Sequence, residues 1–266
     1  MPDDYLHGHV EPVLRSHRWR TAENSAAHLL PRLRPGDRLL DVGCGPGTIS
    51  VDLADRLPDG EVVGVDASAD VVAEAAATAG ERGNVSFRVA DVYDLPDDDG
   101  TYDVVHAHQV LQHLTDPVAA LREMVRVTRP GGVVAVRDSD YGAFTWSPAG
   151  PGMDRWLDRY RQVARGLGAE PDAGRRLLGW CREAAGPSAA VEAGASTWCF
   201  AAPEDRAWWS GLWTDRIASD PLHGRFLGIG ADEDELRDMV AAWRGWADDP
   251  AGWFAVLHGE VLLTVG

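Results

Sequence analysis

Short apolar runs alternate with amphipathic segments through the first half of the chain. The runs are rich in valine and leucine, which is typical of buried parallel strands, and they lie at residues 38–42, 61–66, 85–90, 102–106 and 133–136. Between them, apolar residues recur at helical spacing over 48–57, 68–80 and 116–127. Strands that alternate with helices predict an α/β fold with a doubly wound, mostly parallel sheet.

The second half of the chain contains longer helical segments and two further β-like segments. The β-like segments are 189–200 and 253–265, and the second suits an antiparallel strand that closes a seven-stranded sheet. The predicted organisation is an N-terminal lid and first helix at 1–35, a core at 36–140, α-helical cap insertions at 141–168 and 203–248, and the remainder of the core at 169–202 and 249–266.

The residues from Asp41 to Gly47 join the first strand to the first core helix, and they read Asp-Val-Gly-Cys-Gly-Pro-Gly. Glycine lets the backbone approach a ligand closely because it has no Cβ atom and tolerates positive φ. The dinucleotide-binding fingerprint places its third glycine three residues after its second, whereas Gly45 and Gly47 are two apart, which argues against a nicotinamide cofactor. Asp41 would also repel a pyrophosphate. An adenosine ligand with a cationic amino-acid tail suits this turn better.

This stretch resembles motif I of the class I S-adenosylmethionine-dependent methyltransferases, and three later stretches fall where that family has its other cofactor contacts. The resemblance is close over residues 36–138. It implies S-adenosylmethionine as the cofactor, approached by Asp41, Gly43, Gly45 and Gly47. It also implies displacement at the sulfonium methyl group, for which the enzyme mainly aligns the reactants and excludes water.

Asp66 ends the second strand and follows Gly47 by 19 residues. Nucleotide-binding folds place an acid for the ribose hydroxyls at an interval of roughly 20 residues, so Asp66 is the predicted ribose ligand. The alternative is an acid that only caps the next helix. The resemblance implies further contacts, with Ala67 against the adenine, Asp91 on its amino group, the backbone of Val92 on a ring nitrogen and the backbone at His108 near the methionyl amine.

Arg20 is the candidate for the methionyl carboxylate, because related enzymes fold a leading segment over that end of the cofactor and a guanidinium pairs with a carboxylate bidentately. The alternative for residues 1–20, which include Tyr5, His7 and His9, is a surface helix with aromatic anchors.

Two residues are candidates for acid–base chemistry. His113 lies in a predicted helical continuation of the fourth strand, over 107–114, and could accept a proton from the acceptor near neutral pH. The alternative is a histidine satisfied within the packing. Tyr141 follows Asp138 and Asp140 off the fifth strand, at the sheet edge where doubly wound folds bind ligands. No third ligand accompanies the two acids, so no metal is expected.

Composition narrows the classes of partner. The chain has 266 residues, 45% of them hydrophobic, which is enough for a substantial core. Its net charge of −17 argues against nucleic acid and anionic membrane surfaces. With no apolar stretch long enough to span a membrane and no secretory signal, we expect a cytoplasmic protein. Three cysteines without Cys-x-x-Cys spacing argue against disulfides and zinc.

The expected partner is a small-molecule acceptor, with assembly as a homodimer left open. Tryptophans concentrate in the predicted cap, where they either form its core or line a pocket for a planar, partly apolar acceptor. The pattern is similar to that of the ubiquinone and menaquinone C-methyltransferases and their relatives in secondary metabolism. The large cap favours a secondary metabolite. The alternatives are a quinone acceptor, or a cofactor-binding enzyme of non-methylating activity such as a cyclase.

Overall fold

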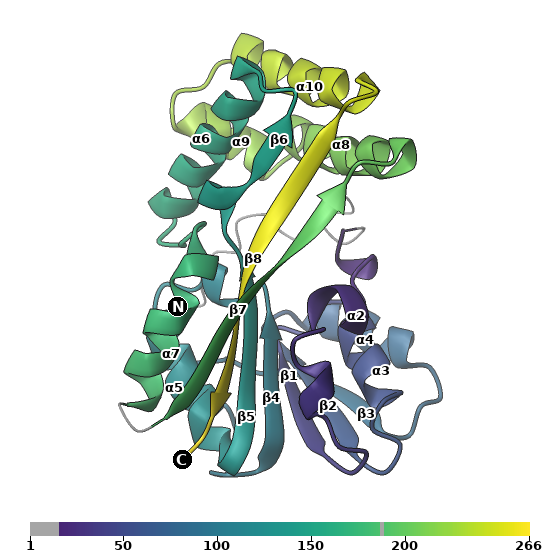
Figure 1. Cartoon of the computed structure of the whole chain (residues 1–266), viewed down its shortest axis with the longest axis vertical. Helices are drawn as coiled ribbons and strands as arrows, with labels where there is room; N and C mark the ends of the chain where they lie inside the picture. Colours follow the sequence, from purple (N-terminus) through teal and green to yellow (C-terminus); the bar gives the residue numbers. More distant parts are fainter. Residues whose placement is uncertain (1–15, 187–188) are drawn as a thin grey trace.

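Eight strands form one sheet in the computed structural model, which describes residues 16–186 and 189–266 (Figure 1). In chain order they are β1 (Arg38–Val42), β2 (Glu61–Asp66), β3 (Val85–Val89), β4 (Tyr102–His108), β5 (Thr128–Ser139), β6 (Thr145–Ser147), β7 (Ala190–Phe200) and β8 (Trp253–Thr264). Across the sheet the order is β3-β2-β1-β4-β5-β8, and β6 and β7 both pair with β8. The first five strands are parallel and β8 is antiparallel to β5, so the predicted doubly wound fold is confirmed.

Helices cover both faces of the sheet and continue above it (Figure 1). The helices beside the sheet are α2 (Ala22–Ser25), α3 (Thr48–Ala54) and α4 (Ala69–Ala79) on one side, and α5 (Pro117–Val127) and α7 (Leu177–Ala185) on the other. The upper group comprises α6 (Pro151–Gly166), α8 (Pro203–Ala218), α9 (Leu222–Gly228) and α10 (Glu233–Asp248). Short 3-10 turns are η1 (Leu30–Arg32), η2 (Leu111–His113), η3 (Tyr141–Ala143) and η4 (Ala173–Arg175). Within the described residues, no helix is long and apolar enough to cross a membrane.

Successive residues of β1 face opposite helical layers. Leu39 belongs to the same buried cluster as Leu53 of α3. Leu40 belongs to the cluster that contains Leu121 of α5. Because helices cover both faces, the strand is apolar along its length rather than alternating with polar residues, which is why the strand runs are visible in the sequence.

The upper helices share a core of their own with the start of β8. Trp156, Trp213 and Trp243 are fully buried there, and the ring of Trp156 makes edge contacts with Trp213 at 4.5 Å and with Trp243 at 4.7 Å. Phe254 of β8 lies 5.4 Å from Trp243, so the long antiparallel strand links the two parts of the molecule. For these tryptophans the core interpretation is confirmed.

The segment after β4 differs from the predicted helix over 107–114. The strand continues to His108, and only the single turn η2 follows. Gln109 has a φ of 54°, a left-handed conformation that turns the chain away from the strand direction. Pro117 then disfavours helical backbone at Asp116, so the next helix begins afresh at Pro117.

The predicted number of strands was one too low. Thr145–Ser147 pairs with Trp253–Ala255 as the short strand β6. The long strand β8 extends beyond the end of β5, which leaves a free edge that β6 occupies. Three residues are too few for a periodicity that the sequence could reveal.

Candidate cofactor and acceptor site

A cavity of about 580 Å³ lies at the carboxyl ends of β1, β2 and β4. The predicted cofactor residues that line it are Arg20, Asp41, Gly43, Gly45, Asp66, Ala67, Asp91, Val92 and His108. The candidate His113 lines it as well. The structure therefore brings together residues that span most of the first half of the chain. The volume falls in the range of pockets that enclose small organic ligands and cofactors.

The glycine turn has the close-approach geometry that its sequence predicts. Gly43, Gly45 and Gly47 all have positive φ, at 65°, 55° and 82°. A Cβ atom on Gly43 would lie 2.4 Å from a methyl group of Val110, so the wall of the cavity has no room for one. Gly47 does not line the cavity. It precedes α3 and a Cβ atom there would meet Ala75 of α4 at 3.0 Å, so helix packing explains this glycine.

Asp66 ties the turn to the next helix. Its carboxylate accepts the backbone N–H of Gly45 at 3.2 Å and that of Ser68 at 3.0 Å. Ser68, not Asp66, caps α4 with its side chain. The simple capping alternative therefore does not describe Asp66, whose carboxylate bridges the end of β2 and the glycine turn at the cavity wall.

Asp41 lines the cavity but turns its carboxylate to neighbouring strands and helices. One oxygen accepts the hydroxyl of Ser50 on α3 at 2.5 Å, and the other lies 2.8 Å from Nδ1 of His106 on β4. Both partners are fully buried. These bonds fix the carboxylate beneath the glycine turn.

The far side of the cavity is more open. Ala67 and Asp91 are exposed, and Val92 is half-buried. Asp91 accepts the backbone N–H of Tyr93 at 2.9 Å, which orients the loop after β3. The opposite wall of the cavity is the buried end of β4.

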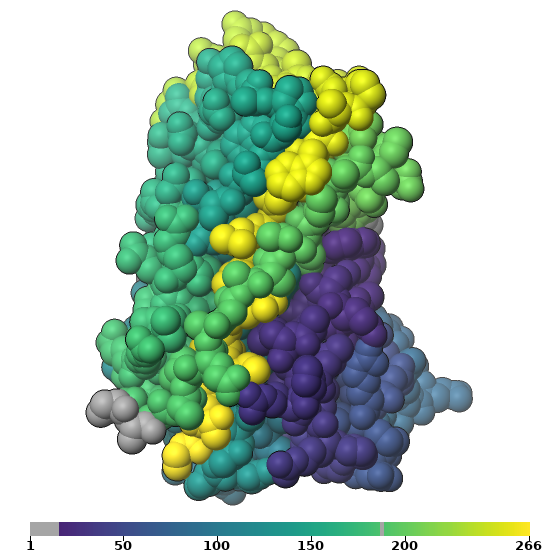
Figure 2. Space-filling view, in the orientation of Figure 1, coloured from purple at the N-terminus to yellow at the C-terminus, as the bar shows by residue number. Residues whose placement is uncertain are grey.

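The described part of the N-terminal segment, residues 16–20, lies between the sheet and the upper helices (Figure 2). Trp19 contacts the rings of Trp198 on β7 at 5.1 Å and Trp208 on α8 at 5.2 Å. The hydroxyl of Thr48 donates to the carbonyl oxygen of His17 at 3.3 Å. Thr21 then caps α2, where its side chain accepts the backbone N–H of Asn24. Tyr5, His7 and His9 lie outside the described residues.

Arg20 joins this segment to the end of β4. Its guanidinium donates to Oε1 of Gln109 at 2.6 Å. The amide nitrogen of Gln109 donates to Oγ of Ser139 at 2.8 Å and lies 2.9 Å from Nε2 of His258. Gln109 is thus held by three side chains in a conformation that costs backbone free energy, a combination found at functional sites.

A second, smaller void of about 30 Å³ adjoins the cofactor cavity. His17, Arg20, Gln109 and His113 line both spaces. The remaining wall is largely aromatic and comes from several elements: Trp19, Tyr141, Phe144, Trp198, Trp208 and Trp209. Trp198 and Trp209 also belong to the buried core of the upper helices, and Trp208 packs against it, so these rings serve the core and the wall of the void together.

The two candidate catalytic residues both reach this void. Burial and the nearby charges of Arg20 and Arg216 lower the pKa of His113 to about 3, so its imidazole is neutral at physiological pH and a weak base. Tyr141 is buried and stacks on Tyr160 at 4.3 Å, and burial raises its pKa. Neither group has the near-neutral pKa of an efficient general base in this state.

Asp138 and Asp140, the two acids expected at the ligand-binding edge of the sheet, do not line either space. Asp140 forms a bidentate ion pair with Arg175, at 2.5 and 2.7 Å. Oδ1 of Asp138 accepts the backbone N–H of Gln112 at 3.2 Å, so this acid holds the η2 turn from behind. Residues alternate sides along a strand, and it is the intervening Ser139 that faces the void.

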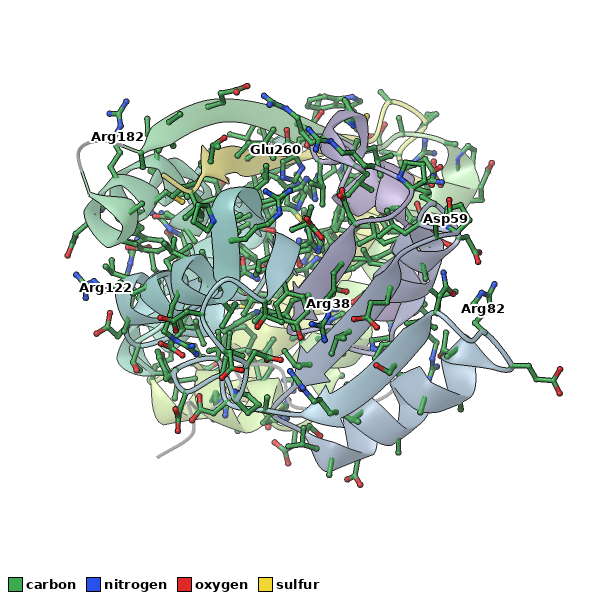
Figure 3. All side chains as sticks on the ribbon, turned by 90° about the horizontal axis from the view of Figure 1, so that it is seen from below. Arg38, Asp59, Arg82, Arg122, Arg182 and Glu260 are labelled. Atoms are coloured by element: carbon green, nitrogen blue, oxygen red, sulfur yellow. The ribbon has the colours of Figure 1, made fainter. Side chains whose placement is uncertain are left out.

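A buried ion pair supports the aromatic wall. Nε of Arg137 on β5 lies 3.1 Å from Glu260 on β8, and its guanidinium stacks over the ring of Trp198 at 5.1 Å. Burial lowers the pKa of Arg137 to about 10. The guanidinium also lies 3.4 Å from Nδ1 of His108, whose pKa burial lowers well below its usual value. Figure 3 shows Glu260 inside the molecule, whereas Arg122 and Arg182 project from its outer edge.

Sequence reasoning missed several residues of the site, chiefly Gln109, Gln112, Ser139 and Arg216. A usable signal existed for Arg216, which follows Trp209 by seven positions and Trp213 by three, the spacing of one helix face. Gln109 and Ser139 directly end or follow strands, so they meet at the carboxyl edge of the sheet.

Residues 33–168 match a family model described as a methyltransferase domain, which is about half of the chain. The chain belongs to the methyltransferases. It is 39% identical to an uncharacterized methyltransferase of Schizosaccharomyces pombe, over 97% of this chain and 95% of that protein. It is 37% identical to the demethylmenaquinone methyltransferase of Beutenbergia cavernae, over 53% of this chain and 56% of that protein.

Among solved structures, a phosphoethanolamine N-methyltransferase of Haemonchus contortus in complex with S-adenosyl-L-methionine shares the fold, with a TM-score of 0.56 and 19% identity over 90% of this chain and 52% of that chain. The methyltransferase uses S-adenosylmethionine as its cofactor. The site fits this group, because the glycine turn leaves no room for side chains at the cavity wall, and acids line the cavity at the end of β2 (Asp66) and just after β3 (Asp91).

Proposed function

We propose that this methyltransferase transfers a methyl group to a planar, partly apolar small molecule, a secondary metabolite. The observation that carries the proposal is the aromatic void that shares a wall with the cofactor cavity. Flat aromatic walls favour flat ligands, since ring faces stack and bury large apolar areas. A quinone is the alternative acceptor, supported by the similarity to a demethylmenaquinone methyltransferase over 53% of this chain.

The residues of the cavity have separable tasks in this proposal. Asp66 accepts hydrogen bonds from the ribose, Ala67, Asp91 and the backbone of Val92 surround the adenine, and Arg20 pairs with the methionyl carboxylate. When bound, the cofactor supplies an electrophilic methyl group on a sulfonium centre. The lid residues 16–20 and the aromatic wall align the acceptor and exclude water.

In this proposal the acidity of the acceptor, and not a strong base on the enzyme, accounts for the loss of its proton. The low pKa of His113 keeps its imidazole neutral and makes it a weak base. An acidic phenol or enol, already ionised in part, needs no strong base, and Tyr141 and His113 then position its oxygen. This favours acceptors with acidic hydroxyl groups over aliphatic alcohols.

The first experiment is calorimetric titration of the protein with S-adenosylmethionine, S-adenosylhomocysteine and NAD in parallel. We expect micromolar binding of the first two and none of NAD. Acceptors are then screened as flat phenols, quinols and polycyclic enols, with mass spectrometry for replacement of a hydrogen by a methyl group. Methylation of aliphatic amines or alcohols in place of flat acceptors would contradict the proposal.

A further inference from the structure

Gln112 is a buried polar residue on the wall of the void that the proposal assigns to the acceptor. It lies in the η2 turn and is only 4% exposed. Its backbone N–H donates to Asp138, and its carbonyl oxygen accepts the N–H of Glu170 at 3.0 Å. Both bonds come from outside the turn, so the position of Gln112 relative to the void is set by the surrounding sheet and loop.

The side-chain amide of Gln112 has one satisfied end and one unsatisfied end. Its Nε2 lies 3.0 Å from Nε2 of His113. Because the imidazole is neutral, a ring nitrogen with a free lone pair can accept the amide N–H. The amide oxygen then points away from His113. Among the described residues it has no hydrogen-bond partner, although it is buried.

Ser139 provides the complementary group on the same wall. Its Oγ accepts a hydrogen bond from Gln109 at 2.8 Å, so its own O–H remains as a donor. Ser139 and Gln112 both line the void. One hydrogen-bond acceptor and one donor beside an aromatic wall match a hydroxyl group, which both donates and accepts. A volume of about 30 Å³ admits a water molecule until an acceptor replaces it.

We propose that Oε1 of Gln112 accepts a hydrogen bond from a hydroxyl or N–H group on the acceptor, which makes Gln112 a specificity-determining residue. A site that buries a polar group rejects analogues that leave it unpaired. The substrate class is thereby narrowed to flat molecules that carry a donor next to the aromatic wall. This inference rests on the proposed function, because it takes the void to be the acceptor site.

The test is a double-mutant cycle on binding, which needs no knowledge of the natural acceptor. The probes are 2-naphthol and 2-methylnaphthalene, which differ by a hydroxyl in place of a methyl group, titrated into the protein saturated with S-adenosylhomocysteine. The variants are Gln112→Met, Gln112→Leu and the control Gln162→Met, which makes the same change on the exposed face of α6. Tryptophan fluorescence reports binding.

The preference for 2-naphthol over 2-methylnaphthalene should fall about 3- to 10-fold in the two Gln112 variants and stay unchanged in Gln162→Met. An unchanged preference in a Gln112 variant that still binds S-adenosylhomocysteine would overturn the inference. Failure of 2-naphthol to bind the wild type up to its solubility limit would overturn it too. Failure of the wild type to bind S-adenosylhomocysteine would instead contradict the methyl-transfer function itself.

A second measurement covers the case in which both Gln112 variants fail to fold. A crystal structure of the wild-type protein with S-adenosylhomocysteine and 2-naphthol should place the naphthol hydroxyl within hydrogen-bond distance of Oε1 of Gln112. A hydroxyl that points elsewhere, with the ring edge against the amide, would contradict the inference.

Discussion

Oδ2 of Asp66 lies 3.2 Å from the backbone nitrogen of Gly45, so the acid at the end of β2 is bonded to the glycine turn after β1. This contact links the two sequence signals on which the cofactor site was predicted. It also places the carboxylate at the wall of the 580 Å³ cavity, where a ribose hydroxyl can replace or share the N–H donor.

Replacing Asp66 with alanine should therefore weaken binding of S-adenosylhomocysteine about 10- to 100-fold, the loss of a hydrogen bond to a charged group of about 1.5–3 kcal/mol. Calorimetry measures the change. The control is Asp70→Ala, which removes an exposed acid from the first turn of α4. Unchanged affinity in a folded Asp66→Ala protein would remove this residue from the ribose site.

Arg20 can be tested with two ligands that differ in the methionyl tail. If its guanidinium pairs with the carboxylate, Arg20→Met should weaken the binding of S-adenosylhomocysteine about 10- to 100-fold. Adenosine lacks that carboxylate, so its binding should stay unchanged. The control is Arg18→Met, two residues earlier, where the guanidinium lies 2.8 Å from Glu74 at the surface. An equal loss for both ligands would mean that Arg20 acts by shaping the lid.

Asp138 predicts a pH dependence of stability. Burial raises the pKa of this carboxyl to about 7, far above the value of about 4 in an unfolded chain. Between these values the folded protein holds a proton that the unfolded chain releases, so this group's stabilising contribution is present at low pH and is lost as the pH rises through 7. An asparagine at position 138 stays neutral at every pH, so the stability that the wild type loses as the pH rises is not lost in Asp138→Asn.

The free energy of unfolding of Asp138→Asn, relative to that of the wild type, should therefore increase between pH 5 and pH 8. Urea denaturation at a series of pH values measures it. The control is Asp98→Asn, in the exposed loop between β3 and β4, which should leave the pH profile of the unfolding free energy as it is in the wild type. If the unfolding free energies of Asp138→Asn and the wild type differ by the same amount at every pH from 5 to 8, Asp138 is ionised in the folded protein.

The sequence predicted best what local rules determine. The strand runs, the glycine turn and Asp66 follow from burial on two faces, from the absence of a Cβ atom and from a fixed interval between strand ends. The predicted cofactor residues accordingly line one cavity, with Gly47 as the exception, because packing against Ala75 also requires a glycine and gives the same sequence signal.

Long-range pairing explains what the sequence could not predict. Arg137, Asp138 and Ser139 are consecutive, yet Arg137 pairs with Glu260, Asp138 accepts a backbone N–H of η2 and Ser139 lines the smaller void. Which side each residue faces depends on the register between β5 and the distant strand β8, with Arg137 opposite Glu260. The left-handed turn at Gln109 likewise depends on partners far along the chain, including His258.

The core of the upper helices yields the last prediction. Trp156 is fully buried between Trp213 and Trp243, so Trp156→Ala removes a large ring from a packed site and leaves a cavity. Such changes cost about 3–5 kcal/mol of unfolding free energy, which urea denaturation detects. Trp253→Ala, at a position 39% exposed at the start of β8, should cost less than about 1 kcal/mol.

Because Trp156 lines neither space of the site, the folded fraction of Trp156→Ala should still bind S-adenosylhomocysteine with wild-type affinity. Equal costs for the two tryptophan variants would contradict a packed core in the cap, and lost cofactor affinity in Trp156→Ala would show instead that the cap and the cofactor cavity are coupled.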